Sequence, residues 1–355
     1  MEWKEQAFIL TAELIAGFLF GRVFIPYFRK IKTGKFDFYI GDRFAKDGSE
    51  PKFGGAVIFM TAALGAGIGI VYNSVSAGRG DSDPLDIRIL LAAVTLIFLV
   101  LCLGLFQDYI KDTGRGIGMK PQYLVAAEYV CCLGFLLILR LFGRNSTSIL
   151  LPFRLGVWEM GSLYYPFMAA LMTAAINMVK VHDCVGGETG NGIDGLCTFT
   201  TFIYALGLLS GCSVMGANSN YIPGNSGESQ LFAICTAGAC AAFMFWNCSP
   251  AKIYLGESGG LLLGGLICVM TELSGLQFAF LLLGVVYIID GICALLQRAV
   301  FGINKKLLLK GDTLHSHLKN KGWGDYRIMA CSAGISILGV CGSVAFFVYS
   351  GMLIY

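Results

Sequence analysis

The sequence is poor in charged residues. Only 14% of its 355 residues are Asp, Glu, Lys or Arg, whereas soluble domains carry about 25%. Histidine is scarcer still, with 3 residues. No two cysteines have CxxC spacing, and most of the 13 stand inside apolar runs, so we expect neither disulfides nor a zinc site. These shortages argue against a soluble enzyme and against a cysteine-rich scaffold.

Long apolar runs take the place of the missing charge. Apolar residues make up 56% of the chain, and its mean hydropathy is +0.70. A membrane-spanning helix needs about 20 residues, and suitable runs lie at 7–27, 54–72, 87–106, 123–142, 161–179, 195–215, 231–247, 259–275, 278–297 and 328–353. We therefore predict an all-α polytopic membrane protein, with one domain over residues 1–355 and about ten transmembrane helices. The charged N-terminus, followed by a run without a small-residue cleavage site, predicts a retained first helix.

Basic residues are distributed unevenly between the two sides of this arrangement. Nineteen of the 26 Lys and Arg residues lie on the odd-numbered connections between spans. The positive-inside rule therefore places these connections in the cytoplasm and both termini outside. The net charge of +3 is too small to indicate a nucleic-acid partner.

Polar clusters gather on the predicted cytoplasmic side. They occupy 46–55, 106–112, 177–196, 246–260 and 314–323. The span interiors are nearly free of ionisable groups, with Glu13 and Glu128 as exceptions, which argues against a transporter with a mid-membrane site. The arrangement instead favours chemistry at the cytoplasmic surface.

The first three clusters have both a structural and a functional interpretation. Lys46 and Lys52 stand before a Gly-Gly helix start, which suits either a positive-inside flank or an anion site. Asp108 and Lys111 share a helix face, as a capping salt bridge or as a metal or proton-transfer group. The Gly-Asn-Gly-Ile-Asp-Gly stretch at 190–195 forms either a helix-closing turn or a close approach to a nucleotide.

The last two clusters favour function. Glu257 lies among glycines at a helix start, and Tyr254 precedes it by about one turn, which pairs a possible metal ligand with a base-stacking ring. His315 and His317 are too close in sequence to share a helical metal face, and no cysteine follows. They suit hydrogen-bond donation to a diphosphate better than zinc binding.

In order and spacing, these motifs resemble the phospho-N-acetylmuramoyl-pentapeptide transferase family, within the polyprenyl-phosphate N-acetylhexosamine-1-phosphate transferase superfamily. The resemblance runs from the start of the second span to Arg327, and His315, His317 and Lys321-Gly322-Trp323 favour the muramoyl-pentapeptide branch. It implies ten transmembrane helices in the bacterial plasma membrane, a homodimer, and an active site facing the cytoplasm. The implied reaction transfers phospho-MurNAc-pentapeptide from UDP to undecaprenyl phosphate in the presence of Mg²⁺, giving lipid I and UMP.

The resemblance also assigns roles to residues. Asp108 would orient the lipid phosphate or the metal, and Glu257 would be the Mg²⁺ ligand. His315, His317 and Lys111 complete the catalytic group. The implied substrate-binding residues are Lys46, Lys52, Lys120, Asn177, Asn191, Gly192, Ile193, Asp194, Asn247 and Tyr254.

The chain departs from the family pattern at catalytic positions. Gln107, Asn191 and Glu257 stand where the family has aspartates, and Ser316 replaces a histidine. Compared with the family spacing, the separation of Asn177 from Asn191 implies an insertion that contains His182, Asp183 and Glu188, and Asp183 or Glu188 could replace the carboxylate missing at Gln107. Two alternatives stay open: a paralogue for another UDP-N-acetylhexosamine, and a catalytically impaired relative that binds nucleotide sugar or lipid.

Overall fold

The fold comes from a computed structural model of the chain. It describes residues 3–33, 50–79, 84–112, 118–143, 147–151, 156–183, 192–218, 226–305 and 308–351. Lys46, Asn191 and Glu188, for which the sequence predicts a role, lie outside these ranges.

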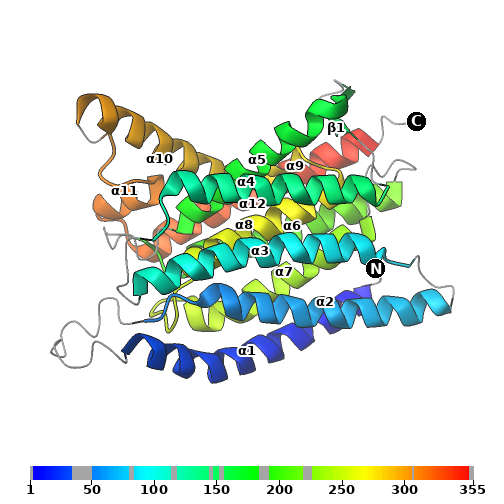
Figure 1. Cartoon of the computed structure of the whole chain (residues 1–355), viewed down its shortest axis with the longest axis horizontal. Helices are drawn as coiled ribbons and strands as arrows, with labels where there is room; N and C mark the ends of the chain where they lie inside the picture. The colour runs from blue at the N-terminus through cyan, green and yellow to red at the C-terminus, as the bar shows by residue number, and fades with distance from the viewer. Residues whose placement is uncertain are drawn as a thin grey trace.

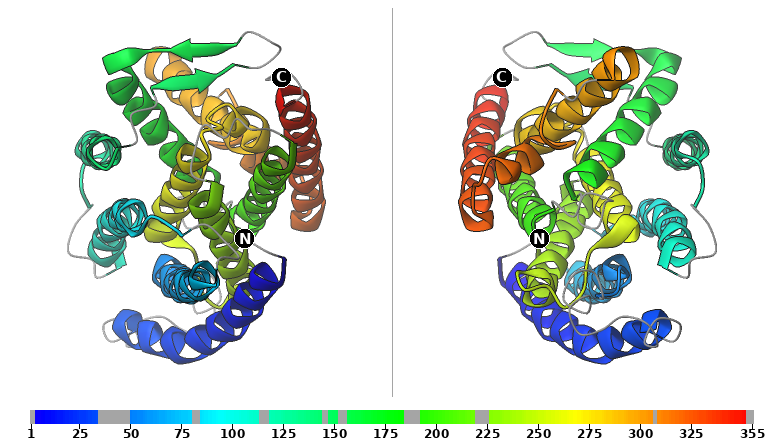
Figure 2. Two further views of the ribbon diagram at one scale, coloured as in Figure 1. Left: turned by 90° about the vertical axis from the view of Figure 1, so that its right-hand side faces the viewer. Right: turned by 90° about the vertical axis from the view of Figure 1, so that its left-hand side faces the viewer.

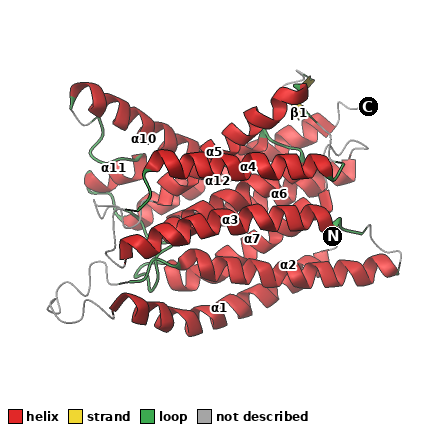
Figure 3. Cartoon of the chain, viewed as in Figure 1, coloured by secondary structure: helices red, strands yellow, loops and turns green. Residues whose placement is uncertain are grey.

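Long helices make up almost all of the described chain (Figure 3). Ten are long and apolar enough to cross a membrane: α1 (Trp3–Thr33), α2 (Gly54–Gly78), α3 (Ile87–Asp112), α4 (Pro121–Leu141), α5 (Tyr164–Asp183), α6 (Leu196–Asn218), α7 (Ser226–Asn247), α8 (Gly256–Ser274), α10 (Val285–Asn304) and α12 (Asp325–Gly351). The prediction of an all-α polytopic membrane protein with ten spans is confirmed. The sidedness from the charge distribution stays a prediction.

The shorter elements lie at the ends of the bundle. The hairpin of β1 (Ser148–Leu150) and β2 (Val157–Glu159) pairs Ser148 with Glu159 and leads through the 3-10 turn η1 (Gly161–Leu163) into α5. Figure 1 shows α11 (Leu314–Asn320) at the opposite end, where α3 and α5 finish.

The predicted ninth span is interrupted. Helix α9 (Ala279–Leu283) stops before Gly284, where ψ is 13°, and α10 starts at Val285. A Cβ at Gly284 would come within 2.6 Å of the Phe280 carbonyl oxygen, so the tight turn needs glycine. The predicted span 278–297 therefore covers α9 and most of α10, but it misses the break and ends before Asn304.

Helices α7 and α8 form the centre of the bundle (Figure 2). Small residues let other helices approach α8 closely. A Cβ at Gly264 of α8 would lie 2.7 Å from Cα of Ile176 on α5, and one at Gly104 of α3 would lie 2.3 Å from Cα of Ser258. This packing fixes the beginning of α8 between the ends of α3 and α5, where the polar side chains gather.

Candidate active site at one end of the bundle

Asp108 caps the first turn of α8. Its Oδ1 accepts a hydrogen bond from the Glu257 N–H at 2.9 Å, and its Oδ2 accepts one from the Ser258 N–H at 2.8 Å. Leu255, the N-cap residue of α8, makes no side-chain cap hydrogen bond, so a carboxylate from α3 satisfies N–H groups that the helix leaves free. Asp108 is 1% exposed and therefore ties α3 firmly to α8.

Glu257 lies between two lysines. Its Oε1 accepts a hydrogen bond from Lys111 Nζ at 2.7 Å, and its Oε2 forms an ion pair with Lys180 Nζ at 2.8 Å. Lys111 comes from α3 and Lys180 from α5, so three helices meet at one carboxylate. The sequence predicted that Glu257, Asp108 and Lys111 lie on the same side of the membrane protein. The structure shows that Lys180 joins them.

Gly256 allows this close approach. Its φ is +74°, a left-handed conformation that favours glycine. An added Cβ would lie 2.2 Å from the Lys52 carbonyl oxygen and 2.8 Å from Asp108 Oδ2. Any side chain here would push the first turn of α8 away from its cap.

Asp183 supplies a third carboxylate, from the last residue of α5. It is 8% exposed, and its side chain makes no hydrogen bond or ion pair with the described chain. It lies close enough to Asp108, Glu257 and Asp194 to be repelled by their charges. The predicted span over residues 161–179 ends too early, because α5 continues through His182 and Asp183.

Gln107 holds the segment before α4. Its Oε1 accepts the Met119 N–H at 2.9 Å, and its Nε2 donates to the Met119 carbonyl at 3.3 Å. An amide can both donate and accept, whereas an ionised aspartate only accepts. The glutamine at position 107 therefore has a structural role. Lys120, which follows Met119, is exposed and is the N-cap residue of α4.

The predicted nucleoside-binding stretch packs against α11. Lys319 Nζ donates to the Gly192 carbonyl at 2.8 Å, while Ile193 is buried against Leu318 and Ile328. Asp194 Oδ2 accepts the Ala251 N–H at 3.3 Å. Burial raises the pKa of the Asp194 carboxyl above its ordinary value, and the Ala251 hydrogen bond opposes that rise.

Asn247 and Tyr254 shape the loop before α8. Asn247 is 2% exposed, donates to the Ile253 carbonyl at 3.0 Å and accepts from Thr198 at 3.0 Å. The Tyr254 backbone bonds to Pro51 and Gly54 at 2.9 and 3.0 Å, on either side of Lys52. Asn247 thus holds the loop, and the half-buried ring of Tyr254 stays a candidate for base stacking.

Asn177 is engaged one turn before Lys180. Its amide donates to Glu128 of α4 at 2.5 Å and to the Thr173 carbonyl at 2.9 Å. Both amide hydrogens are therefore used inside the protein. The predicted substrate-binding role of Asn177 stays a prediction, and the structure shows it linking α4 to α5.

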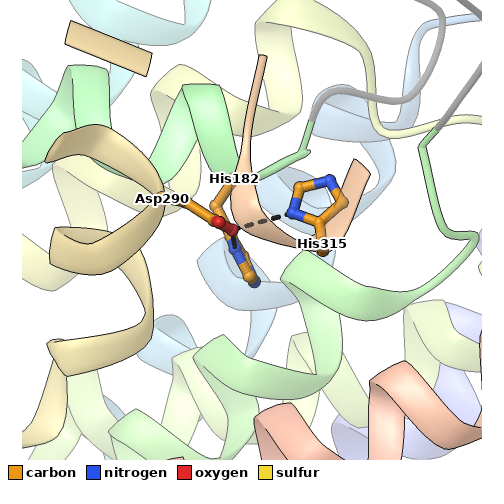
Figure 4. Close-up of side chains that lie close together, drawn as sticks. All are labelled: His182, Asp290 and His315. Carbon is orange, nitrogen blue, oxygen red and sulfur yellow. Dashed lines mark hydrogen bonds and ion pairs between the residues drawn. The ribbon is translucent and has the colours of Figure 1, made fainter. Parts of the chain in front are cut away.

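The two predicted histidines have different surroundings. His317 is half-buried, and its Nδ1 accepts the Lys310 N–H at 2.9 Å. His315 is buried and does not reach the Asp108 and Glu257 pair: its Nδ1 bonds to Asp290 at 2.8 Å and its Nε2 contacts Thr313 at 3.2 Å (Figure 4). Sequence reasoning missed Asp290, although an acidic residue inside an apolar span is a signal.

A family model for glycosyl transferase family 4 matches residues 90–275, more than half of the chain. The chain belongs to glycosyl transferase family 4. The match runs from α3 to the end of α8, so Asp108, Lys111, Lys180, Asp183 and Glu257 all fall inside it. As a member of this family, the protein is a transferase.

The chain is also similar over nearly its whole length to bacterial proteins named phospho-N-acetylmuramoyl-pentapeptide-transferase. The one from Desulfitobacterium hafniense is 27% identical, with 97% of this chain and 98% of the relative covered. The one from Clostridium beijerinckii is 28% identical over 95% and 96%, and that from Heliobacterium modesticaldum 27% over 96% and 98%. This chain is therefore a divergent relative of these enzymes.

Proposed function

We propose that this protein transfers phospho-MurNAc-pentapeptide from its UDP carrier to undecaprenyl phosphate. An oxygen of the lipid phosphate attacks the β-phosphorus of the donor and forms a new P–O bond. The bond from that phosphorus to the bridging oxygen breaks, and UMP leaves with the bridging oxygen and its electron pair. The products are lipid I and UMP.

The observation that carries this proposal is the Glu257 carboxylate held between Lys111 and Lys180, with Asp183 beside it. Two anionic phosphates repel each other, so their reaction needs cationic groups fixed around the reacting phosphorus. Lys111 is 42% exposed and Lys180 23%, and both have long, flexible side chains that extend to phosphate oxygens. Asp108 keeps Glu257 in place by capping α8.

The same acidic residues suit a divalent cation. Asp183 has no hydrogen-bond partner in the described chain, and carboxylate oxygens are the ligands that Mg²⁺ prefers. Asp183 and Glu257 would hold the ion, whereas both Asp108 oxygens already accept backbone N–H groups. When bound, Mg²⁺ supplies positive charge to the phosphate oxygens.

The remaining assignments follow from the resemblance of the sequence motifs to the phospho-N-acetylmuramoyl-pentapeptide transferase family. Gly192, Asp194 and Tyr254 contact the uridine, and the buried Ile193 supports this stretch through its packing on Leu318 and Ile328. His317, Lys52 and Lys120 bind the diphosphate and the lipid phosphate. The active site faces the cytoplasm of a bacterial plasma membrane, in agreement with the distribution of basic residues. The protein works as a homodimer.

Release of UMP tests the function directly. We expect the purified protein, given undecaprenyl phosphate and Mg²⁺, to release UMP from UDP-MurNAc-pentapeptide. Release from UDP-GlcNAc alone would instead identify a paralogue for another sugar. UDP binding without any release would identify a non-catalytic relative. A chelator such as EDTA should stop the reaction reversibly.

Asp183→Asn tests the metal site. We expect the Mg²⁺ concentration for half-maximal rate to rise roughly 10- to 100-fold, because a charged ligand is lost. In the parent, Mg²⁺ should raise the melting temperature, since a bound ion stabilises the folded state, and this rise should be largely lost in the variant. Asp312→Asn removes an exposed acid and is the control. An unchanged Mg²⁺ response in Asp183→Asn would exclude Asp183 as a ligand.

A further inference from the structure

Three buried side chains from three helices meet beside the candidate active site (Figure 4). Asp290 comes from α10, His182 from the last turn of α5 and His315 from the first turn of α11. They are 3%, 0% and 3% exposed. His182 lies 108 positions before Asp290, and Asp290 lies 25 before His315, so the fold brings them together.

Asp290 accepts three hydrogen bonds. Its Oδ2 receives His182 Nδ1 at 2.6 Å and His315 Nδ1 at 2.8 Å, and its Oδ1 receives the Leu314 N–H at 2.9 Å. The third bond satisfies an N–H group at the start of α11, which Thr313 also caps by accepting from the Ser316 N–H. One carboxylate therefore joins α5, α10 and α11.

The hydrogen bonds fix the tautomers of both rings. An ionised carboxylate only accepts, so each Nδ1 must carry the hydrogen. In a neutral ring of this tautomer, Nε2 carries no hydrogen. The Nε2 of His182, which has no partner in the described chain, therefore leaves no buried donor unsatisfied. The His182 ring also packs edge-on against Tyr287 and His315, with centroids 5.0 and 5.5 Å away, so it has little freedom to turn.

The residues tied down in this way stand next to the candidate catalytic groups. His182 directly precedes Asp183, which is the unpartnered carboxylate of the site. His315 is two residues before His317, and Lys319 of the same short helix reaches the Gly192 carbonyl. A shift of α11 against α5 would therefore move both sides of the site.

We propose that Asp290 is a positioning residue. Through its bonds to His182 and His315, it fixes the positions of Asp183 and His317 relative to each other. This inference rests on the proposed transferase function. Asp290 itself lies behind the two rings and does not touch the reacting phosphates. Its contribution is to the geometry of the transfer step, since misplacement of reacting groups by about 1 Å can cost a hundredfold in rate.

Asp290→Asn is the decisive variant. Its amide nitrogen would face an imidazole N–H, which places two donors against each other. The ring of His182 could avoid this contact by moving its hydrogen to Nε2, but that N–H would then be buried without a partner. We expect kcat for UMP release to fall roughly 10- to 100-fold. KM for the UDP donor should change less than about threefold, because Asp194 and Asn247 are held by contacts that do not involve Asp290. Asp290→Glu, which keeps the carboxylate, should recover part of the loss.

The matched control is Asp312→Asn. Asp312 is an exposed acid on the same connection between α10 and α11, and its replacement should leave kcat unchanged. Asp290→Asn with kcat within threefold of the parent would overturn the proposal. So would stoichiometric binding of a transition metal by the parent that His182→Ala abolishes, because the cluster would then be a metal site.

Histidine-labelled protein gives a readout that does not depend on turnover. With 3 histidines in the chain, ¹⁵N spectra resolve the ring nitrogens, and we expect the Nδ1–H form for two of them in the parent. Asp290→Asn should change both and should speed amide exchange in α11, whereas Asp312→Asn should do neither. If the parent releases no UMP, the proposed function fails, and unchanged spectra in Asp290→Asn would separately refute the role of Asp290.

Discussion

Replacing Glu257 with alanine is expected to lower the turnover number for UMP release by on the order of a thousandfold. The substitution removes the counterion of both Lys111 and Lys180 and one of the two proposed metal ligands. Two ammonium groups then repel each other where the phosphates must be aligned. The effect is measured as kcat with saturating donor, lipid phosphate and Mg²⁺.

Two further substitutions separate the charge of Glu257 from its length. Glu257→Gln keeps the shape but loses the charge, and should be nearly as inactive as the alanine variant. Glu257→Asp keeps the charge and restores the residue of the family pattern, and the flexible lysines can follow a carboxylate that is one methylene shorter. We therefore expect Glu257→Asp to retain or improve the parent activity.

Glu50→Ala is the control for a lost ion pair. Glu50 pairs with Arg29 at 2.8 Å, and its side chain is 25% exposed against 22% for Glu257. Its removal should leave kcat unchanged, since partly exposed pairs contribute about 0–1 kcal/mol to folding. Near-normal turnover in Glu257→Ala would show that the candidate site is wrong.

The fold was largely predictable from the sequence because the lipid environment imposes a simple rule. Backbone groups in hydrocarbon must bond within the chain, so long apolar runs become helices. The break at Gly284 was not predictable, because it depends on the position of the Phe280 carbonyl in the folded chain. The sequence also did not predict that α5 extends to Asp183, because polar residues after an apolar run are typical of a connecting loop.

The candidate site was predictable only in part. Motif order brought Asp108, Lys111 and Glu257 to one end of the bundle, and the structure shows them in contact. Lys180 was counted only as a positive-inside residue, and its pairing with Glu257 requires the packing of α5 on α8. The bonds of Gln107 to Met119 likewise could not be inferred, because they depend on how the chain turns before α4.

Asp108→Asn is expected to destabilise the protein and to reduce activity together. The amide keeps the shape of the side chain but puts a donor against one of the two backbone N–H groups of α8 that Asp108 now accepts. An unsatisfied buried group costs roughly 1–3 kcal/mol, which should lower the melting temperature. Because Glu257 sits in the turn that loosens, kcat should fall by on the order of a hundredfold.

Asp86→Asn provides the comparison, because Asp86 also accepts a backbone N–H at a helix start, that of Arg88 at 2.9 Å. Hydrogen bonds from Arg88 hold the pKa of Asp86 below its ordinary range, so it is ionised at neutral pH. Asp86 lies at the other end of α3 from Asp108, and its replacement should lower the stability somewhat but leave kcat unchanged.

If Asp108→Asn instead loses activity with an unchanged melting temperature and normal amide protection at the start of α8, Asp108 acts on the substrate or metal and not as a cap. The fall of both quantities together in Asp108→Asn, and of stability alone in Asp86→Asn, is the result that the geometry predicts.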